Sequence, residues 1–325
     1  MKPFSGIGYS LEVHPDIDQF RQQLSLVQDA GFTHVEVDPR PGYLWVGGKT
    51  IGANLATIIH ALAEYRDHLR FTLHGPYDIN SFDCGRQAMH RHLLDSTVEV
   101  AREIGAEAVV VHPGRRTLAL DTGTPPMRDL LEREREWLHS AAVKLDGSGC
   151  ALALENWLPE KPDEYSYSFW PEQLAAHIES VEHSGVGICL DVGHLFLAST
   201  WLGFDFIEGA ERVSSLVRHI HLQDLFANPA LRQAPELGAG DLHLPPGWGE
   251  IPLEELFQRV SFPQSPVLNA ELIPAAFLPH LNAVAASCYA LTRLSPVVDT
   301  ANDNRYREGV GKSLDIGASG AISAR

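Results

Sequence analysis

Nine side chains of the types that bind divalent metal ions follow short apolar runs along the chain, and none of them falls within a predicted helix. The runs read FTLH, AVVVH, LALE, ICLD, VRHIH and NAE. The nine residues are His74, His112, Glu155, Asp191, His194, His221, Asp241, His243 and Glu271. Imidazoles and carboxylates are ligands for Zn²⁺ and related ions, and a cation offsets the repulsion between carboxylates that share a small volume. If folding gathers these residues, they indicate a site for several divalent cations.

A histidine or carboxylate at the end of a strand can also be a buried polar group that hydrogen bonds satisfy. That interpretation stays open for each residue taken alone. It explains six consecutive strand ends of this kind less well. Without a cation, the pKa values of several carboxylates in one cavity are expected to be pushed apart or upward.

Short apolar runs alternate with segments of helical periodicity along most of the chain. The predicted strands are 7–11, 34–37, 71–74, 108–112, 151–155, 187–191, 219–222 and 267–271. The predicted helices are 17–30, 53–65, 86–104, 126–146, 171–184, 206–216, 253–260 and 278–294. This alternation is typical of parallel strands covered by helices, and the length suits one barrel of about 250 residues with extensions. We therefore expect an α/β protein with a single-domain (β/α)8 TIM barrel over residues 1–295, whose chemistry lies at the C-terminal ends of the strands.

Two further segments stand out. The connection 224–251 is rich in proline and glycine and too long for a simple linker, so we expect an active-site loop there. The segment 296–325 is poor in large apolar residues, and we expect much of it to be a mobile C-terminal tail.

Composition limits the classes of protein that fit. Lysine and arginine total 25 against 42 aspartates and glutamates, a net charge of −17, which argues against broad affinity for nucleic acid or anionic membranes. Cys84, Cys150, Cys189 and Cys288 show no CxxC spacing, as in a protein of a reducing compartment. The N-terminus lacks the apolar core of a secretory signal, and no apolar segment reaches about 18 residues. We expect a cytoplasmic protein without membrane segments.

Six short motifs resemble those of one superfamily. They are HGPYDIN at 74–80, HPG at 112–114, ENW at 155–157, DVGH at 191–194, HLQD at 221–224 and NAEL at 269–272. Together they resemble the xylose-isomerase-like TIM barrels, which include endonuclease IV (AP endonuclease family 2), and the resemblance extends from about Ile7 to Leu272. It implies a metal-dependent enzyme.

The superfamily has two branches that differ in the number of metal ions. In the isomerases and epimerases, four ligands hold one ion, and the matching residues are Glu155, Asp191, His221 and Glu271. The endonuclease IV branch holds three zinc ions, and the resemblance implies as further ligands His74, His112, His194, Asp241 and His243, with Glu155 bridging two ions. The DLH element at 241–243 precedes PPGWGEIPL, which resembles the Gly-x-Gly-Glu-Ile turn of that branch although PPGW departs from it.

The cofactors implied are up to three Zn²⁺ ions, and the same nitrogen and oxygen ligands also accept Mn²⁺, Mg²⁺, Fe²⁺ or Co²⁺. A cluster of three ions suits hydrolysis of a phosphodiester, because metals can stabilise both the attacking and the leaving oxygen. The alternative is a single-metal sugar or keto-acid isomerase or epimerase, in which Glu155 and Glu271 act as catalytic groups that move a proton. A barrel with a purely structural metal is a third interpretation. The number of candidate ligands favours the hydrolase.

The residues of the predicted loops after the strands bear on the substrate. The basic residues are Arg40, Lys49, Arg86, Arg115, Arg116 and Arg232, and the acidic ones are Asp38, Asp78, Asp83, Asp121, Asp163 and Glu236. This mixture is typical of a solvated rim and not of a continuous track for DNA, although Arg115 and Arg116 are candidates for binding one phosphate group. The aromatic residues of these loops are Tyr43, Trp45, Tyr77, Trp157, Tyr165, Tyr167, Phe169, Trp170 and Trp248.

Our candidates for substrate binding are Tyr77, Arg115, Arg116, Trp157 and Trp248. Aromatic rings with modest positive charge favour a bulky small-molecule phosphodiester over duplex DNA, without excluding nucleic acid as a partner. The superfamily also includes a phosphodiesterase that remodels cobamides, and the chain is compatible with such a substrate. The sequence does not indicate an oligomeric state.

Overall fold

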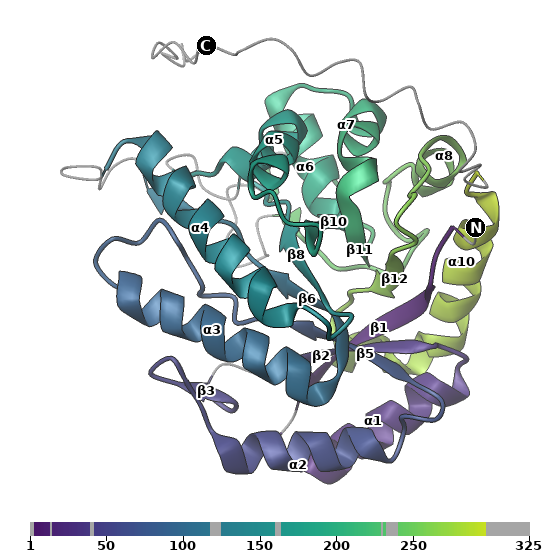
Figure 1. Ribbon diagram of the computed structural model, residues 1–325. Coiled ribbons are helices and arrows are strands. Elements are labelled where there is room, and N and C mark those ends of the chain that lie inside the picture. Colours follow the sequence, from purple (N-terminus) through teal and green to yellow (C-terminus); the bar gives the residue numbers. More distant parts are fainter. Residues whose placement is uncertain are drawn as a thin grey trace.

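Eight parallel strands close into a barrel in the order β1-β12-β11-β10-β8-β6-β5-β2. The computed structural model describes residues 3–13, 15–39, 42–117, 125–159, 164–228, 230–231 and 240–296. Figure 1 shows the helices arranged around the outside of the strands. Apart from Pro296, the predicted tail lies outside the described residues. The chain is thus an α/β protein with a TIM-barrel fold.

Every predicted barrel strand is present, with ends that differ from the prediction by at most two residues. The strands are β1 (Gly6–Val13), β2 (His34–Pro39), β5 (Arg70–His74), β6 (Ala106–Val111), β8 (Ala151–Glu155), β10 (Val186–Asp191), β11 (Val217–Leu222) and β12 (Val267–Ala270). Most of their residues are buried on both faces, because parallel barrel strands pack against helices outside and side-chain layers inside. Two antiparallel pairs lie outside the barrel, β3 (Trp45–Val46) with β4 (Lys49–Thr50), and β7 (Arg116–Thr117) with β9 (Glu164–Tyr165).

The covering helices follow the apolar periodicity of the sequence. They are α1 (Ile17–Asp29), α2 (Gly52–Ala63), α3 (Gln87–Ile104), α4 (Met127–Leu145), α5 (Pro171–Ser180), α6 (Val192–Leu202), α7 (Phe206–Val213), α8 (Leu253–Arg259), α9 (Pro274–Phe277) and α10 (Leu281–Leu294), with short 3-10 turns at Tyr167–Phe169, Ser214–Leu216 and Leu278–His280. In α1, Phe20, Leu24 and Val27 form the buried stripe. None of the described helices combines the length and the apolar character needed to cross a lipid bilayer.

Helix α6 corrects one expectation, because it places His194 in its first turn. Its sequence, VGHLFLASTWL, is largely apolar and buried, so it lacks the one-sided pattern that identifies an amphipathic helix. Asp191 ends β10 and caps the helix, since its Oδ1 accepts the backbone N–H of His194 at 2.7 Å. The capping bond keeps Asp191 and His194 within one turn of each other.

A buried carboxylate of α4 ties together three connections at the C-terminal end of the barrel. Glu134 Oε1 accepts hydrogen bonds from Ser81 Oγ and from the backbone N–H of Gly114, each at 2.6 Å. Its Oε2 accepts from the hydroxyl of Tyr167 and lies 3.1 Å from His177 Nε2. Burial alone would raise the pKa of Glu134, but the hydrogen bonds and the charge of His177 outweigh it and lower the pKa. This carboxylate therefore fixes the HPG segment that follows β6.

The variant Glu134→Gln should lower the free energy of unfolding by about 3 kcal/mol near pH 7, because the amide cannot accept all four contacts and leaves a buried donor unsatisfied. A lowered pKa means that the carboxylate stabilises the fold above the unfolded-state value of about 4.3, and that this contribution is lost as the pH falls through the folded-state pKa. Urea denaturation at several pH values should show the difference between variant and wild type shrinking in acid.

The control is Glu132→Gln on the same helix, whose exposed carboxylate pairs with Arg135. Its effect should stay below about 1 kcal/mol. Equal stability of the Glu134→Gln variant and the wild type at neutral pH would contradict the role assigned to Glu134.

Candidate metal centre

The nine predicted ligands lie at the C-terminal face of the barrel. His74, Glu155 and Asp191 are the last residues of β5, β8 and β10, and His221 is the penultimate residue of β11. His112 and Glu271 follow β6 and β12 directly, and His194 lies in the first turn of α6. Asp241 and His243 belong to the long connection between β11 and α8. The ends of parallel strands meet at one face, which brings together residues that are far apart in sequence.

The first group consists of His74, His112 and Glu155. The Nε2 atoms of the two histidines lie 3.6 and 3.2 Å from Glu155 Oε2. Their Nδ1 atoms face backbone carbonyls, His74 that of Gly75 at 2.8 Å and His112 that of Tyr77 at 3.2 Å. A proton on Nδ1 that is donated to a carbonyl leaves Nε2 as the nitrogen that can bind a cation.

The second group consists of Glu155, Asp191, His221 and Glu271, whose ligand atoms all lie within 4.8 Å of one another. His221 Nδ1 is 3.1 Å from Glu271 Oε2 and 3.4 Å from Glu155 Oε1. Glu155 thus presents one oxygen to each of the first two groups, the arrangement that a carboxylate between two cations requires.

The third group consists of His194, Asp241 and His243. The Nε2 atoms of both histidines point to Asp241 Oδ2, at 3.4 Å from His194 and 2.9 Å from His243. The Nδ1 atoms again face backbone carbonyls, since His194 contacts Asn156 and His243 contacts Glu271, each at 3.0 Å. His194 Nδ1 also lies 3.3 Å from Glu155 Oε1. The structure therefore brings all nine predicted residues into one connected cluster.

Burial and mutual repulsion shift the acid–base properties of this cluster. Burial raises the pKa of Asp191 to about 7, and the charges of Glu271, Asp241 and Glu155 add to the rise. Burial also opposes protonation of the imidazoles. At His74 and His243, however, neighbouring carboxylates outweigh it and raise the pKa to about 10. At His112 burial prevails and lowers the pKa to about 4. Protons on the imidazoles thus balance the carboxylates when no cation does.

Two amide side chains that the sequence interpretation missed hold the cluster in place. Gln223 Nε2 donates to Asp191 Oδ2 at 3.1 Å and to Asp241 Oδ1 at 2.8 Å, and its Oε1 accepts the backbone N–H of His243 at 3.0 Å. Asn156 pairs through its side chain with the backbone of Asp191. Both residues lie within the ENW and HLQD motifs, but an amide gives no signal of its own beside stronger ligand types.

One carboxylate organises the connection that carries Asp241 and His243. Asp224 accepts backbone N–H groups of Leu225, Gly247 and Ile251 at 2.8 to 3.1 Å. Its own backbone pairs with Leu244 through two hydrogen bonds. His243 has a positive φ of 48°, an uncommon conformation for a residue other than glycine. The described part of the predicted active-site loop thus returns to the barrel mouth, while residues 229 and 232–239 lie outside the described residues.

Three of the predicted substrate-binding residues adjoin the cluster. The Tyr77 ring stacks on His74 at a centroid distance of 4.5 Å, and its hydroxyl donates to Asp38 Oδ2 at 2.8 Å. The Trp157 ring contacts His112 at 4.5 Å and His194 at 5.4 Å. Arg115 Cζ lies 4.2 Å from the centre of the Trp157 ring. Two aromatic rings, the exposed Tyr77 and the buried Trp157, and the cationic Arg115 therefore border the first and third groups.

The other rim predictions have mixed outcomes. Arg116 lies over Tyr165 in the β7–β9 pair, and Trp248 is half exposed against Phe277 and His280. Among the aromatic residues of the loops, Trp45, Trp157, Tyr167 and Phe169 are buried, and Tyr167 is held inside by its bond to Glu134. Arg86 pairs with Asp83 at 2.7 Å. Arg40, Asp121, Asp163, Arg232 and Glu236 lie outside the described residues.

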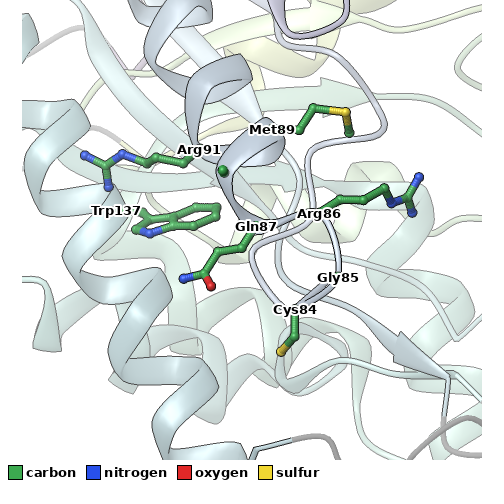
Figure 2. A pocket seen from close by; sticks show the side chains of 8 residues that line it. Cys84, Gly85, Arg86, Gln87, Met89, Arg91 and Trp137 are labelled. Carbon is green, nitrogen blue, oxygen red and sulfur yellow. The ribbon is translucent and has the colours of Figure 1, made fainter.

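A cavity of about 770 Å³ lies away from this cluster, between α3 and α4. Figure 2 shows its lining, which includes Cys84, Arg86, Arg91 and Trp137. None of the nine clustered residues lines it. Its size therefore gives no reason to move the candidate site from the barrel mouth.

The donor atoms at the barrel mouth fit divalent cations. Among the described residues, the buried atoms His74 Nε2, Glu155 Oε2 and Glu271 Oε2 have no hydrogen-bond partner. Each belongs to one of the groups above, and an unpaired buried polar atom is costly unless a ligand satisfies it. Imidazole nitrogen with carboxylate oxygen is a donor set that suits Zn²⁺ and neighbouring divalent metals.

Fold and site together define a TIM barrel with a cluster of metal-ligand side chains at its C-terminal face. The chain belongs to the xylose isomerase-like TIM barrel family, whose model matches residues 24–275. It is 28% identical over 199 residues to a probable endonuclease 4 of Mycobacterium ulcerans, covering 60% of this chain and 70% of that protein. It is 24% identical over 211 residues to an uncharacterized protein of Methanocaldococcus jannaschii, covering 62% of this chain and 64% of its relative, less than two-thirds of that relative's length.

Solved structures with the same fold are more distant in sequence. A D-tagatose 3-epimerase-like protein superposes with a TM-score of 0.66 at 16% identity, covering 89% of this chain and 98% of its own. The IOLI protein, whose structure contains a zinc atom, gives a TM-score of 0.60 at 17% identity, covering 88% and 96%. At this identity the likeness establishes the fold alone.

The variant Gly249→Ala should destabilise the protein by about 1 to 3 kcal/mol, because a Cβ atom there would lie 2.3 Å from Asp224 Oδ1 and 2.4 Å from the carbonyl oxygen of Leu225. Chemical denaturation measures the loss. Gly52→Ala at the start of α2 is the matched control, since a Cβ atom there meets no atom within 4 Å. Equal stability of the two variants would show that the loop is not packed as described.

Proposed function

We propose that this protein is a metal-dependent hydrolase of a phosphodiester, with up to three Zn²⁺ or similar ions held by the nine clustered residues. The observation that carries the proposal is the third group, because Asp241 and His243 face His194 from the long connection. A site for one ion needs only the second group. The similarity to proteins named probable endonuclease 4 also supports a phosphodiester as the substrate.

When bound, divalent cations would stabilise charge on the attacking and leaving oxygens and would lower the pKa of a water. The protein would orient them through Glu155, which faces two groups, and through imidazoles that backbone carbonyls hold in place. Within the described residues, Glu271 Oε2 has no hydrogen-bond partner although His221 Nδ1 lies 3.1 Å away, and it would accept a proton from an attacking water. Trp157 would exclude bulk water from the side of the cluster near His112 and His194.

The surroundings of the cluster favour a bulky small-molecule substrate over duplex DNA. Arg115, stacked on Trp157, could bind one phosphate oxygen, and the rings of Tyr77 and Trp157 could contact a flat group attached to it. The net charge of −17 opposes the long-range attraction that a polyanion-binding surface requires. A cobamide-like substrate is compatible with these features.

The alternative function is a single-metal sugar or keto-acid isomerase or epimerase. The specific observation in its favour is the second group, whose four ligands already suffice for one ion. Glu155 and Glu271 would then transfer the proton. Incorporation of solvent deuterium at a substrate carbon would support this chemistry, whereas turnover of phosphate esters would not.

The variant Asp241→Ala should lose about one metal ion per chain and reduce phosphodiesterase activity by about 100-fold or more, because it removes the carboxylate between His194 and His243. Elemental analysis gives the ratio of metal to protein, and a screen of nucleotide phosphodiesters, corrinoids and abasic DNA gives the activity. Free ketoses in the same screen test the alternative.

Asp78→Ala is the matched control, since Asp78 is an exposed carboxylate of the loop after β5. It should keep the metal content and activity of the wild type. A wild-type protein that binds a single ion, together with an Asp241→Ala variant of unchanged activity, would reject the three-ion hydrolase.

Binding of Zn²⁺ to the metal-free protein should release protons and weaken as the pH falls from about 8 to about 6. Burial raises the pKa of Asp191 to about 7, and the carboxylate of Asp241 overcomes burial to raise that of His243 to about 10. Both groups must lose protons to bind a cation, so the affinity should change about 10-fold per pH unit for each proton released. Calorimetry in buffers of different ionisation enthalpy measures the release. Binding without proton release would contradict the protonated, metal-free cluster.

A further inference from the structure

A buried carboxylate lies behind the cluster, in the interior of the barrel. Glu36 belongs to β2 and is fully buried, as are His219 and His221 on β11. Residues two apart in a strand face the same side, so both histidines of β11 point inward. Glu36 Oε2 lies 2.9 Å from His219 Nε2 and 3.0 Å from His221 Nε2. Oxygen Oε2 of Glu36 thus contacts the imidazoles of both His219 and His221.

The other oxygen of Glu36 is held by the adjacent strand β1 and by β12, the strand beyond it. Glu36 Oε1 accepts the Ser10 hydroxyl at 2.8 Å and the Asn269 amide at 3.2 Å. Asn269 also donates to Ser10 Oγ at 2.7 Å. Four hydrogen bonds from β1, β11 and β12 therefore fix the carboxylate, which leaves it little freedom to move toward the cluster.

These contacts determine which nitrogen of His221 faces the cluster. If Nε2 carries the proton donated to Glu36, Nδ1 has a free lone pair, and Nδ1 is the atom that lies 3.1 Å from Glu271 Oε2 and 3.4 Å from Glu155 Oε1. A carboxylate behind a histidine fixes the ring orientation and tautomer and makes the other nitrogen a better ligand.

We propose that Glu36 is a positioning residue that holds His221 ready to bind a cation and thereby sets the metal affinity of the centre without contacting the ion. This inference rests on the proposed function, because it requires His221 to be a ligand. His219 supports Glu36 from the neighbouring position, and its Nδ1 makes no hydrogen bond within the described part of the chain.

A competing arrangement would place an additional ion among Glu36, His219 and His221, whose ligand atoms also lie within 4.8 Å of one another. An ion there would need both Nε2 atoms without protons, and His221 would have to bind different ions through its two nitrogens. The existing hydrogen bonds favour positioning, and a count of bound ions separates the two arrangements.

The test compares zinc binding to the full chain and to the variant Glu36→Gln, by competition with a chelator and by elemental analysis. The expected result is an unchanged ratio of zinc to protein at saturation, with one ion bound about 10- to 100-fold more weakly. Glutamine keeps the size of the side chain, but its NH₂ group would face either the two histidines or Ser10 and Asn269, all of which donate to Glu36. Glu36→Asp, which keeps the charge and withdraws the carboxylate, carries the same test if Glu36→Gln does not fold.

Two further variants sharpen the result. His219→Gln retains a side-chain N–H for Glu36, so it should keep every ion with an affinity within about threefold of the wild type. Loss of one ion in this variant would overturn the positioning role in favour of the additional site. Glu107→Gln removes a carboxylate that contacts His34 and Arg70 and should leave zinc affinity unchanged.

The outcomes for the two proposals are distinguishable. Equal zinc affinity of the wild type and both Glu36 variants would overturn the positioning role and leave the proposed hydrolase intact. A wild-type protein that binds no zinc rejects the metal centre itself.

Discussion

The balance of charge at the barrel mouth is the constraint on which the rest of the site depends. Four carboxylates and five imidazoles from seven segments of the chain contact one another in a largely buried volume. Carboxylates at such distances repel strongly when water is excluded, and only protons or cations on the neighbouring groups relieve that repulsion. The raised pKa values of His74, His243 and Asp191 express the same balance in the absence of a metal.

Rigid elements keep the cluster assembled in spite of this repulsion. Backbone carbonyls fix four of the imidazoles, and Gln223 links Asp191 to Asp241. Glu36 and Glu134 are a second layer of buried carboxylates, each with several donors, which hold a strand histidine and the HPG segment. Polar groups of this kind restrict geometry, since each is costly to bury in any arrangement that leaves it unpaired.

The barrel was predictable from the sequence because the spacing of apolar residues follows which side chains are buried. Each strand run was apolar and short, and each predicted helix alternated apolar and polar faces, whereas α6 and the four-residue α9 were not predicted. Helix α6 escaped because nearly all of its side chains are buried, so the pattern that reveals other helices is missing. Residue types and strand ends likewise pointed to the clustered residues of the strands, since parallel topology brings strand ends together, whereas the ligand roles of His194, Asp241 and His243 came from the family resemblance.

The supporting residues were not predictable in the same way. Glu36 occupies the middle of an apolar strand, where a single charge gives no hint of which histidine it meets across the barrel. Gln223 and Asp224 act through contacts with a loop about twenty residues further along the chain. The burial of Tyr167, which lies in a predicted loop, depends on its hydrogen bond to Glu134 of α4. Such contacts are set by tertiary packing and leave no periodic trace in the sequence.

The β11–α8 connection carries two of the clustered side chains, whereas the others belong to the barrel strands or follow them. Six of the clustered side chains come from strand ends or the residues next to them and His194 comes from the first turn of α6, whereas Asp241 and His243 come from a loop that Asp224 holds through backbone hydrogen bonds. Under the proposed function, replacement of that connection would change the number of ions that the centre holds while the strands keep their register. Within such a scaffold, the evolution of new chemistry would need the exchange of one peptide segment and no rebuilding of the core.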